Sequence, residues 1–113
     1  MNYNRAIGNI GEDMASAILK QYGYDVIDRN YICKLGEIDI IAIEIKSRII
    51  SFIEVKTRTG STYGYPAQSI SGSKIRHIRN VANIFLSEHK EFNSYNVSFD
   101  VFEIETRFNT DCF

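Results

Sequence analysis

The sequence predicts an α/β domain with a small mixed sheet flanked by helices. Two segments carry apolar residues at helical spacing, and four others are rich in β-branched and aromatic residues. Along the chain these segments predict the order helix, strand, strand, strand, helix, strand. A helix between the last two strands is typical of a crossover connection, which joins parallel strands. The sequence therefore predicts a mixed sheet with a helix on each face.

Both helices are predicted from an apolar stripe and a terminal signal. The first spans Arg5–Tyr22 and stops before Gly23, since glycine is common just past a helix end. Its stripe consists of Ile7, Ile10, Met14, Ile18 and Tyr22. The second begins after Ser71 or Ser73, either of which is a suitable N-cap. Its stripe consists of Ile75, Ile78, Ala82, Phe85 and Leu86.

Four strands are predicted, and the middle two form a hairpin. The outer segments are Tyr24–Ile32 and Val97–Ile104. The hairpin strands are Glu37–Glu44 and Ile49–Thr57, joined by a short polar link at 45–48. Both faces of this hairpin are apolar, which is typical of internal strands that are covered on each side.

Length and composition indicate a single domain, 1–113, with a core of about 4–105 and an unpatterned tail at 106–113. A hydrophobic content of 44% with 24% charged residues is typical of a folded globular chain and excludes a disordered one. Acidic residues interrupt the longest apolar runs, and the N-terminus lacks a secretory pattern, so no membrane partner is expected. Two cysteines without a histidine cluster favour reduced thiols in the cytoplasm over a zinc site. Thr59–Ser71, which contains the sole proline, is predicted to be a loop.

Asp39 and Glu54 are the residues that most directly suggest a function. If the hairpin closes over the link, Asp39 faces Glu54 with Cβ atoms about 5 Å apart. Two like charges at that distance repel each other, and a divalent cation held by both carboxylates and the Val55 carbonyl would remove the repulsion. Lys56 projects from the same face. This is the arrangement of a metal-dependent phosphodiesterase site, and the ordinary alternative is a pair of solvated strand ends.

Other charged residues belong to segments around this pair. Glu12 borders the apolar stripe of the first helix, so it is either a rim residue or a third carboxylate near the metal. The net charge is only −1, but basic residues gather near the predicted site. At the start of the second helix they form either a solvated face or a phosphate-binding surface. The expected nucleic-acid contacts are Arg58, Lys74, Arg76 and Arg79.

A set of short motifs carries a resemblance over about Asn4–Ile104. They are Gly11-Glu12, Arg29-Asn30, Gly36-Glu37-Ile38-Asp39, Phe52-Ile53-Glu54-Val55-Lys56-Thr57-Arg58, Tyr63-Gly64 with Pro66, Lys74 and Phe99-Asp100. Together they resemble the YraN-like family, a bacterial group of uncharacterised, endonuclease-like proteins. Through that family the chain resembles the PD-(D/E)XK nuclease superfamily, whose restriction-endonuclease-like core has the same α-β-β-β-α-β order. Within the superfamily it is similar to archaeal Holliday-junction resolvases.

The resemblance implies a role for each matching residue. Asp39 and Glu54 would hold Mg²⁺ or Mn²⁺, and Lys56 would orient or deprotonate the attacking water. Glu12 would match the helix-borne acid of the resolvase branch. The family's Arg-Phe-Asp is replaced here by Ser98-Phe99-Asp100. The lost arginine weakens a phosphate-binding role for that segment and leaves its aspartate as a structural residue.

These observations favour a magnesium- or manganese-dependent nuclease acting on DNA, with branched and single-stranded forms both open. The alternative is a nuclease-fold protein that binds nucleic acid or serves as a scaffold with little or no cleavage. The net acidity favours that alternative, whereas the intact set of Asp39, Glu54 and Lys56 favours the enzyme. Substrate structure, protein partners and a homodimer are left open by the sequence.

Overall fold

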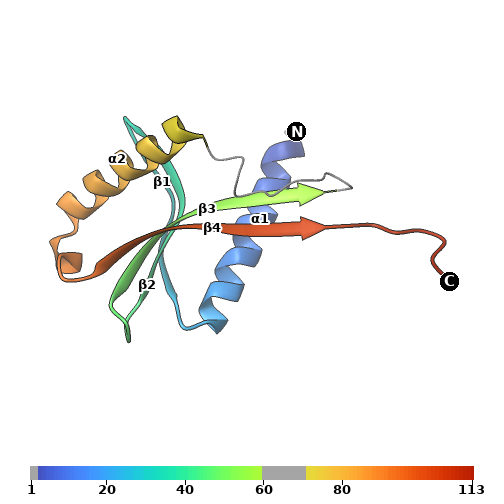
Figure 1. Ribbon diagram of the computed structural model, residues 1–113, viewed down its shortest axis with the longest axis horizontal. Helices are drawn as coiled ribbons and strands as arrows, with labels where there is room; N and C mark the ends of the chain where they lie inside the picture. Colours follow the sequence, from blue (N-terminus) through green and yellow to red (C-terminus); the bar gives the residue numbers. More distant parts are fainter. Residues whose placement is uncertain (1–2, 60–70) are drawn as a thin grey trace.

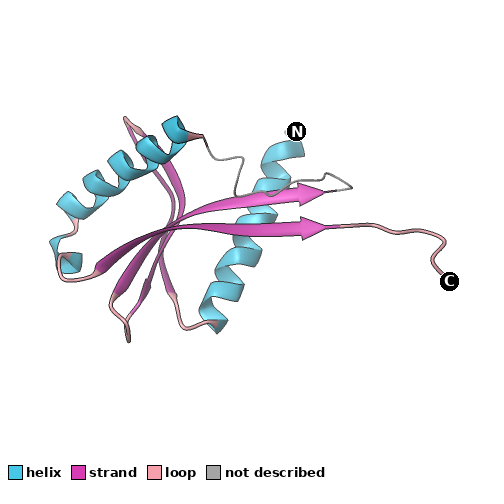
Figure 2. Cartoon of the chain, in the orientation of Figure 1, coloured by secondary structure: helices cyan, strands magenta, loops and turns pink. Residues whose placement is uncertain are grey.

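The computed structural model describes residues 3–59 and 71–113 as a mixed four-stranded sheet with one helix on each side (Figure 1). The predicted loop after the third strand falls almost wholly outside these residues. Figure 2 shows the helices and strands in the same orientation. In chain order the elements are α1 (Tyr3–Gln21), β1 (Asp25–Cys33), β2 (Gly36–Glu44), β3 (Ile49–Thr59), α2 (Gly72–Glu88), the 3₁₀ turn η2 (Lys90–Phe92) and β4 (Asn96–Thr106).

The strand order confirms the predicted topology. It is β1-β2-β3-β4, so the two hairpin strands are internal. The first two pairings are antiparallel, and β3 pairs with β4 in parallel. This parallel ladder runs from Ile49 and Asn96 to Thr59 and Thr106. Continuous pairing explains why β3 and β4 extend two residues beyond their predicted C-terminal ends.

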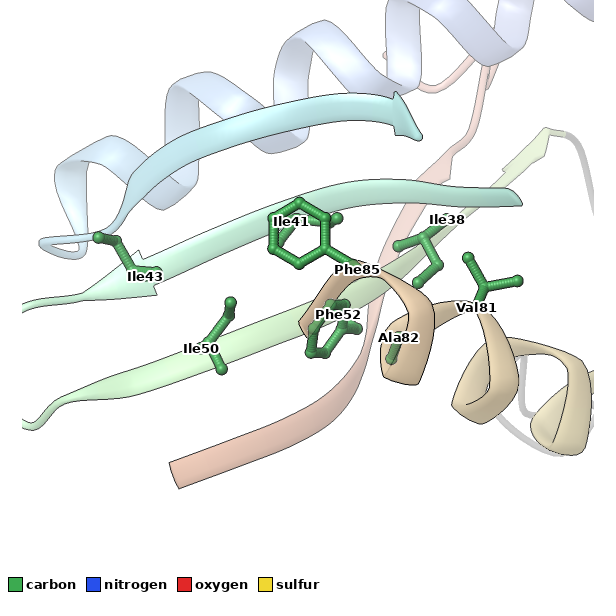
Figure 3. Close-up of a cluster of buried hydrophobic side chains, with 8 residues drawn as sticks. All are labelled: Ile38, Ile41, Ile43, Ile50, Phe52, Val81, Ala82 and Phe85. Carbon is green, nitrogen blue, oxygen red and sulfur yellow. The ribbon is translucent and has the colours of Figure 1, made fainter. Parts of the chain in front are cut away.

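The sheet has an apolar core on each face, as the hairpin pattern predicted. On one face, side chains of β2 and β3 pack against α2, and Phe52 meets Phe85 edge-on at 5.9 Å between ring centroids (Figure 3). On the other face, Ala15 and Leu19 of α1 pack in a second cluster. The predicted stripe of α1 was wrong as a buried face, because its Ile10, Met14 and Tyr22 are exposed. Full burial of each large apolar side chain contributes roughly 1.5–3 kcal/mol. Among the described residues, neither helix is long and apolar enough to cross a membrane.

Both helices have the predicted terminal residues. Gly23 has φ 91°, and its amide donates to the Lys20 carbonyl at 3.1 Å while the Tyr24 amide donates to Leu19 at 3.0 Å. This pair of bonds is the Schellman motif, for which glycine is the favoured residue. At the start of α2, Ser71 Oγ accepts a hydrogen bond of 3.1 Å from the Lys74 amide. The cap fixes where the first turn of α2, and with it Lys74, lies over the sheet.

Gly11 lets α1 approach β3 closely. A Cβ atom at this position would overlap the Thr57 Cγ2 atom and would lie 3.7 Å from Val55 Cγ1. Helix and strand therefore touch at the point where an ordinary side chain would hold them apart. The close approach brings the next helix residue, Glu12, toward the end of the hairpin where Asp39 and Glu54 lie.

Candidate functional site

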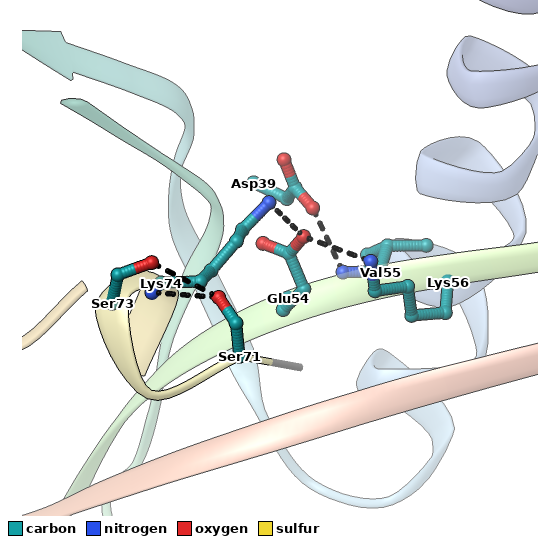
Figure 4. A network of polar contacts seen from close by, with 7 residues as sticks. All are labelled: Asp39, Glu54, Val55, Lys56, Ser71, Ser73 and Lys74. Atoms are coloured by element: carbon teal, nitrogen blue, oxygen red, sulfur yellow. Dashed lines mark hydrogen bonds and ion pairs between the residues drawn. The ribbon is translucent and has the colours of Figure 1, made fainter. Parts of the chain in front are cut away.

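Asp39 and Glu54 lie at the end of the paired part of the hairpin. The β2–β3 ladder runs from Glu44 and Ile49 to Ile40 and Ile53, in the predicted register. Asp39 and Glu54 are the next residue on each strand. Beyond the last pair, the Val55 amide donates a hydrogen bond of 2.8 Å to Asp39 Oδ2 (Figure 4). The main chain of one strand thus holds the carboxylate of the other.

Glu54 is buried and meets two lysines. Its side chain is 8% exposed, and Oε1 lies 2.7 Å from Lys74 Nζ and 3.8 Å from Lys56 Nζ (Figure 4). Lys56 follows on the same strand, as predicted, whereas Lys74 reaches in from the first turn of α2. A buried carboxylate needs such partners, because an unpaired buried charge is strongly destabilising.

The surroundings of Asp39 disfavour its charged form. Burial is the largest cause, and together with the charges of its acidic neighbours it raises the pKa of Asp39 from 3.8 to about 7. These neighbours are Glu54, Glu12 and Glu37, and the hydrogen bond from Val55 acts in the opposite direction. Conversely, the hydrogen bond to Glu54 raises the pKa of Lys74. The site therefore has an excess of negative charge and favours a cation.

Glu12 lies on the inner side of α1. Its side chain is 12% exposed, against 70% for its neighbour Asp13, which points outward. Arg29 Nη2 lies 2.8 Å from Asp13 Oδ1 and 3.7 Å from Glu12 Oε1. Within the described part of the chain, that buried oxygen of Glu12 has no hydrogen-bond partner. Glu12 is thus largely buried and near enough to Asp39 for its charge to raise the pKa of that residue, a position that differs from a solvated rim.

The four basic residues expected to contact nucleic acid lie in different surroundings. Lys74 contacts Glu54 of the acidic pair. The Arg79 guanidinium lies 4.6 Å from the centre of the Phe99 ring. Arg76 is exposed on α2, and Arg58, near the end of β3, lines a groove together with residues of α1. The structure thus brings together Asp39, Glu54, Lys56 and Lys74 and leaves the three arginines around them.

The donor atoms suit a hard divalent cation. Asp39, Glu54 and the Val55 carbonyl would supply oxygen ligands, the type that Mg²⁺ prefers. The raised pKa of Asp39 and the Lys74 ammonium 2.7 Å from Glu54 both mark a place that attracts positive charge. In the described ranges, no three Asp, Glu, His or Cys side chains form a metal-binding group. An ion here would therefore complete its shell with water or substrate oxygens, as Mg²⁺ usually does.

Two features of this site were missed from the sequence. The first is Glu37, whose charge raises the pKa of both Asp39 and Lys74. Its position two residues before Asp39 could have pointed to it. The ion pair between Lys74 and Glu54 had no local signal, because it depends on where α2 lies over the sheet.

Comparisons with known proteins match nearly the whole chain. The uncharacterised protein family UPF0102 matches residues 11–104. A UPF0102 protein of Clostridium perfringens (strain 13 / Type A) is 47% identical over 102 residues, covering 90% of this chain and 81% of that protein. A UPF0102 protein of Caldicellulosiruptor saccharolyticus is 45% identical over 100 residues, covering 88% and 82%. The matched region includes every residue of the candidate site, so the resemblance is confirmed: the chain belongs to the uncharacterised family UPF0102, the YraN-like group.

Proposed function

We propose that the chain is a divalent-metal-dependent nuclease that hydrolyses phosphodiester bonds in DNA. The observation that carries this proposal is the opposed pair Asp39 and Glu54 at the end of two internal strands, with Lys56 beside them. Family membership supports it, because the YraN-like group has a nuclease-like fold.

Each residue of the candidate site has its own expected role in the reaction. A Mg²⁺ or Mn²⁺ ion held by Asp39, Glu54 and the Val55 carbonyl would polarise the phosphate and lower the pKa of bound water. Lys56 cannot ligate a metal but can orient the attacking water through its ammonium hydrogens. Lys74 would hold a non-bridging phosphate oxygen at the positive end of α2. Arg76, farther along that helix, would hold a flanking phosphate.

A second candidate is a binding or scaffold protein with a nuclease-like fold. The observation in its favour is the Lys74 ammonium 2.7 Å from Glu54, which neutralises this acid without any metal. On this interpretation Glu54 and its lysines form a structural ion-pair cluster. DNA would then be bound through the surrounding arginines and would not be cut.

Incubation with DNA of defined form distinguishes the two candidates. Linear duplex, single-stranded and four-way-junction DNA are each incubated with magnesium, manganese or EDTA. We expect cleavage of at least one form with metal and none with EDTA. Asp39→Asn should abolish the cleavage, and Glu91→Gln, which changes an exposed acid in η2, should not. DNA binding without cleavage in either metal would favour the second candidate.

A further inference from the structure

A cavity of about 290 Å³ lies between α2 and the β3–β4 pair, directly beside the acidic residues. It exists because α2 packs mainly over β2 and leaves part of β4 uncovered on that side. Its apolar walls are formed mainly by Phe52, Ile75, Ile78 and Phe99. Phe99 and Ile75 remain 37% and 45% exposed, so the cavity is open to solvent. Apolar walls with a few polar groups are typical of sites for small ligands.

Phe99 and Arg79 give this cavity a flat recognition surface. The ring of Phe99 stacks on Phe52 at 5.7 Å between centroids, with 27° between the ring planes. The Arg79 guanidinium lies over Phe99 at 4.6 Å and also lines the cavity. The arginine is thus held against an aromatic ring, with hydrogen-bond donors available at the cavity wall.

The charges at the cavity disfavour an anion and allow a neutral, planar group. Among the described residues whose side chains face it, Glu54 is the acid and Arg79 the base. The Asp100 carboxylate, which accepts a hydrogen bond of 2.8 Å from Ser98, lies on the opposite face of the sheet, because Asp100 pairs with Ile53 of the core under α1. The buried Glu54 carboxylate would repel a phosphate inside the cavity. An uncharged ring with carbonyl and ring-nitrogen acceptors would meet the apolar walls and the Arg79 donors.

We propose that this cavity binds an unpaired nucleobase from the DNA strand whose phosphate lies at Asp39 and Glu54. The inference rests on the proposed function and names its substrate class. Glu54 lines the cavity and belongs to the acidic pair, so a base in the cavity and a phosphate at the pair would be neighbours on one strand. Bases in a duplex are paired and stacked, so the cavity selects single-stranded or unpaired nucleotides next to the cut. The Arg79 guanidinium then supplies the plane on which the base stacks, and Phe99, which holds that guanidinium in place, is a specificity-determining residue.

The test measures affinity for a base separately from affinity for the backbone. Fluorescence anisotropy with calcium in place of magnesium compares a short oligothymidine with an abasic oligomer of the same length. Wild type should prefer oligothymidine by about 5- to 150-fold, the range for stacking one base on an aromatic side chain. Phe99→Leu should lose most of this preference while its affinity for the abasic oligomer stays unchanged. Phe108→Leu, the same change at a 90% exposed ring in the tail, should keep it.

A second variant covers the case in which Phe99→Leu fails to fold. Arg79→Gln removes the guanidinium at the helix surface and should reduce the same preference, with a melting temperature close to that of wild type. Equal affinity of wild type for both probes, or an undiminished preference in both variants, would overturn the inference. Binding of neither probe would overturn it as well and would point to a different occupant, such as an aromatic side chain of a protein.

These outcomes are distinguishable from failure of the proposed function. Cleavage of DNA without a base preference would support the nuclease proposal and contradict the assignment of the cavity to a nucleobase. A base preference that depends on Phe99, without cleavage in magnesium or manganese, would support the cavity assignment and contradict the proposal that the protein is a nuclease.

Discussion

Lys74 Nζ lies 2.7 Å from Glu54 Oε1, although the two residues come from different elements, α2 and β3. The ammonium occupies one side of a carboxylate that a metal ion would also need. Lys74 and a bound divalent ion would therefore compete for Glu54. This competition distinguishes a metal site from a structural ion pair.

Removal of Lys74 should strengthen metal binding and weaken the metal-free fold. Lys74→Ala leaves Glu54 buried with only the more distant Lys56 Nζ, at 3.8 Å. Loss of a charge-assisted hydrogen bond of this kind costs about 1.5–3 kcal/mol. Calorimetric titration with manganese should show tighter binding than in wild type, and Arg76→Ala, a change on the exposed face of α2, should match wild type. Unchanged manganese affinity in Lys74→Ala, with stability lost, would support the structural ion pair instead.

Stability should fall as pH rises, because of Asp39. Its carboxyl has a pKa of about 7 in the folded state, above the ordinary value of 3.8, so the folded state holds the proton more tightly. Without metal, the free energy of unfolding should decrease from about pH 4 to about pH 7 and then level off. The expected loss is on the order of 1–2 kcal/mol after allowance for solvent screening. Urea denaturation in EDTA measures this slope.

Asp39→Asn provides the matched control for that profile. The amide cannot ionise, and its oxygen can still accept the hydrogen bond from the Val55 amide. The variant should lack the decrease above about pH 4 and should exceed wild type in stability near pH 8 in EDTA. Identical pH profiles for wild type and Asp39→Asn would show that Asp39 ionises in the folded protein as it does in water.

Metal should stabilise wild type and should need Asp39. At about 100 times its dissociation constant, a bound ion adds roughly 2.7 kcal/mol to the free energy of unfolding. Magnesium or manganese should therefore raise the melting temperature of wild type and of Glu91→Gln, but not that of Asp39→Asn. A melting temperature that is indifferent to both metals and to EDTA in all three proteins would contradict the site.

Two glycines of α1 should respond in opposite ways to alanine. At Gly8 no atom of the described residues lies within 4 Å of an added Cβ, so Gly8→Ala should stabilise the helix by roughly 0.5–1 kcal/mol. At Gly11 the Cβ would overlap Thr57 Cγ2, and overpacking of this kind costs about 1–3 kcal/mol. Thr57→Ser removes the overlapping methyl group and should recover part of the loss. Thermal denaturation of the variants checks this, and equal effects at both glycines would contradict the close approach of helix and strand.

The sequence predicts the fold and the acidic pair because both depend on local patterns. Apolar residues on both faces of the hairpin predict internal strands, and the link at 45–48 sets the register that brings Asp39 to Glu54. Gly23 and Ser71 mark helix ends through main-chain geometry that few other residues satisfy. Each inference uses neighbours along one strand or one helix.

The remaining features depend on how separate elements pack, and no local pattern reports this. The pairing of Lys74 with Glu54 and the cavity at Phe99 both follow from the position of α2 over β2 instead of β4. The groove that Arg58 lines with residues of α1 follows from the close approach of that helix to the end of β3. These packing relationships set where the charges of the candidate site and the cavity beside it lie.

The most direct test of the nuclease account is the cleavage rate of Lys56→Ala with magnesium or manganese. If Lys56 positions or deprotonates the attacking water, the cleavage rate of this variant should fall by about 100- to 10,000-fold, the range typical for such a residue. Manganese binding should survive, because an ammonium is not a ligand. Lys46→Ala, in the exposed hairpin link, should cleave like wild type. Cleavage that persists undiminished in Lys56→Ala would contradict the account.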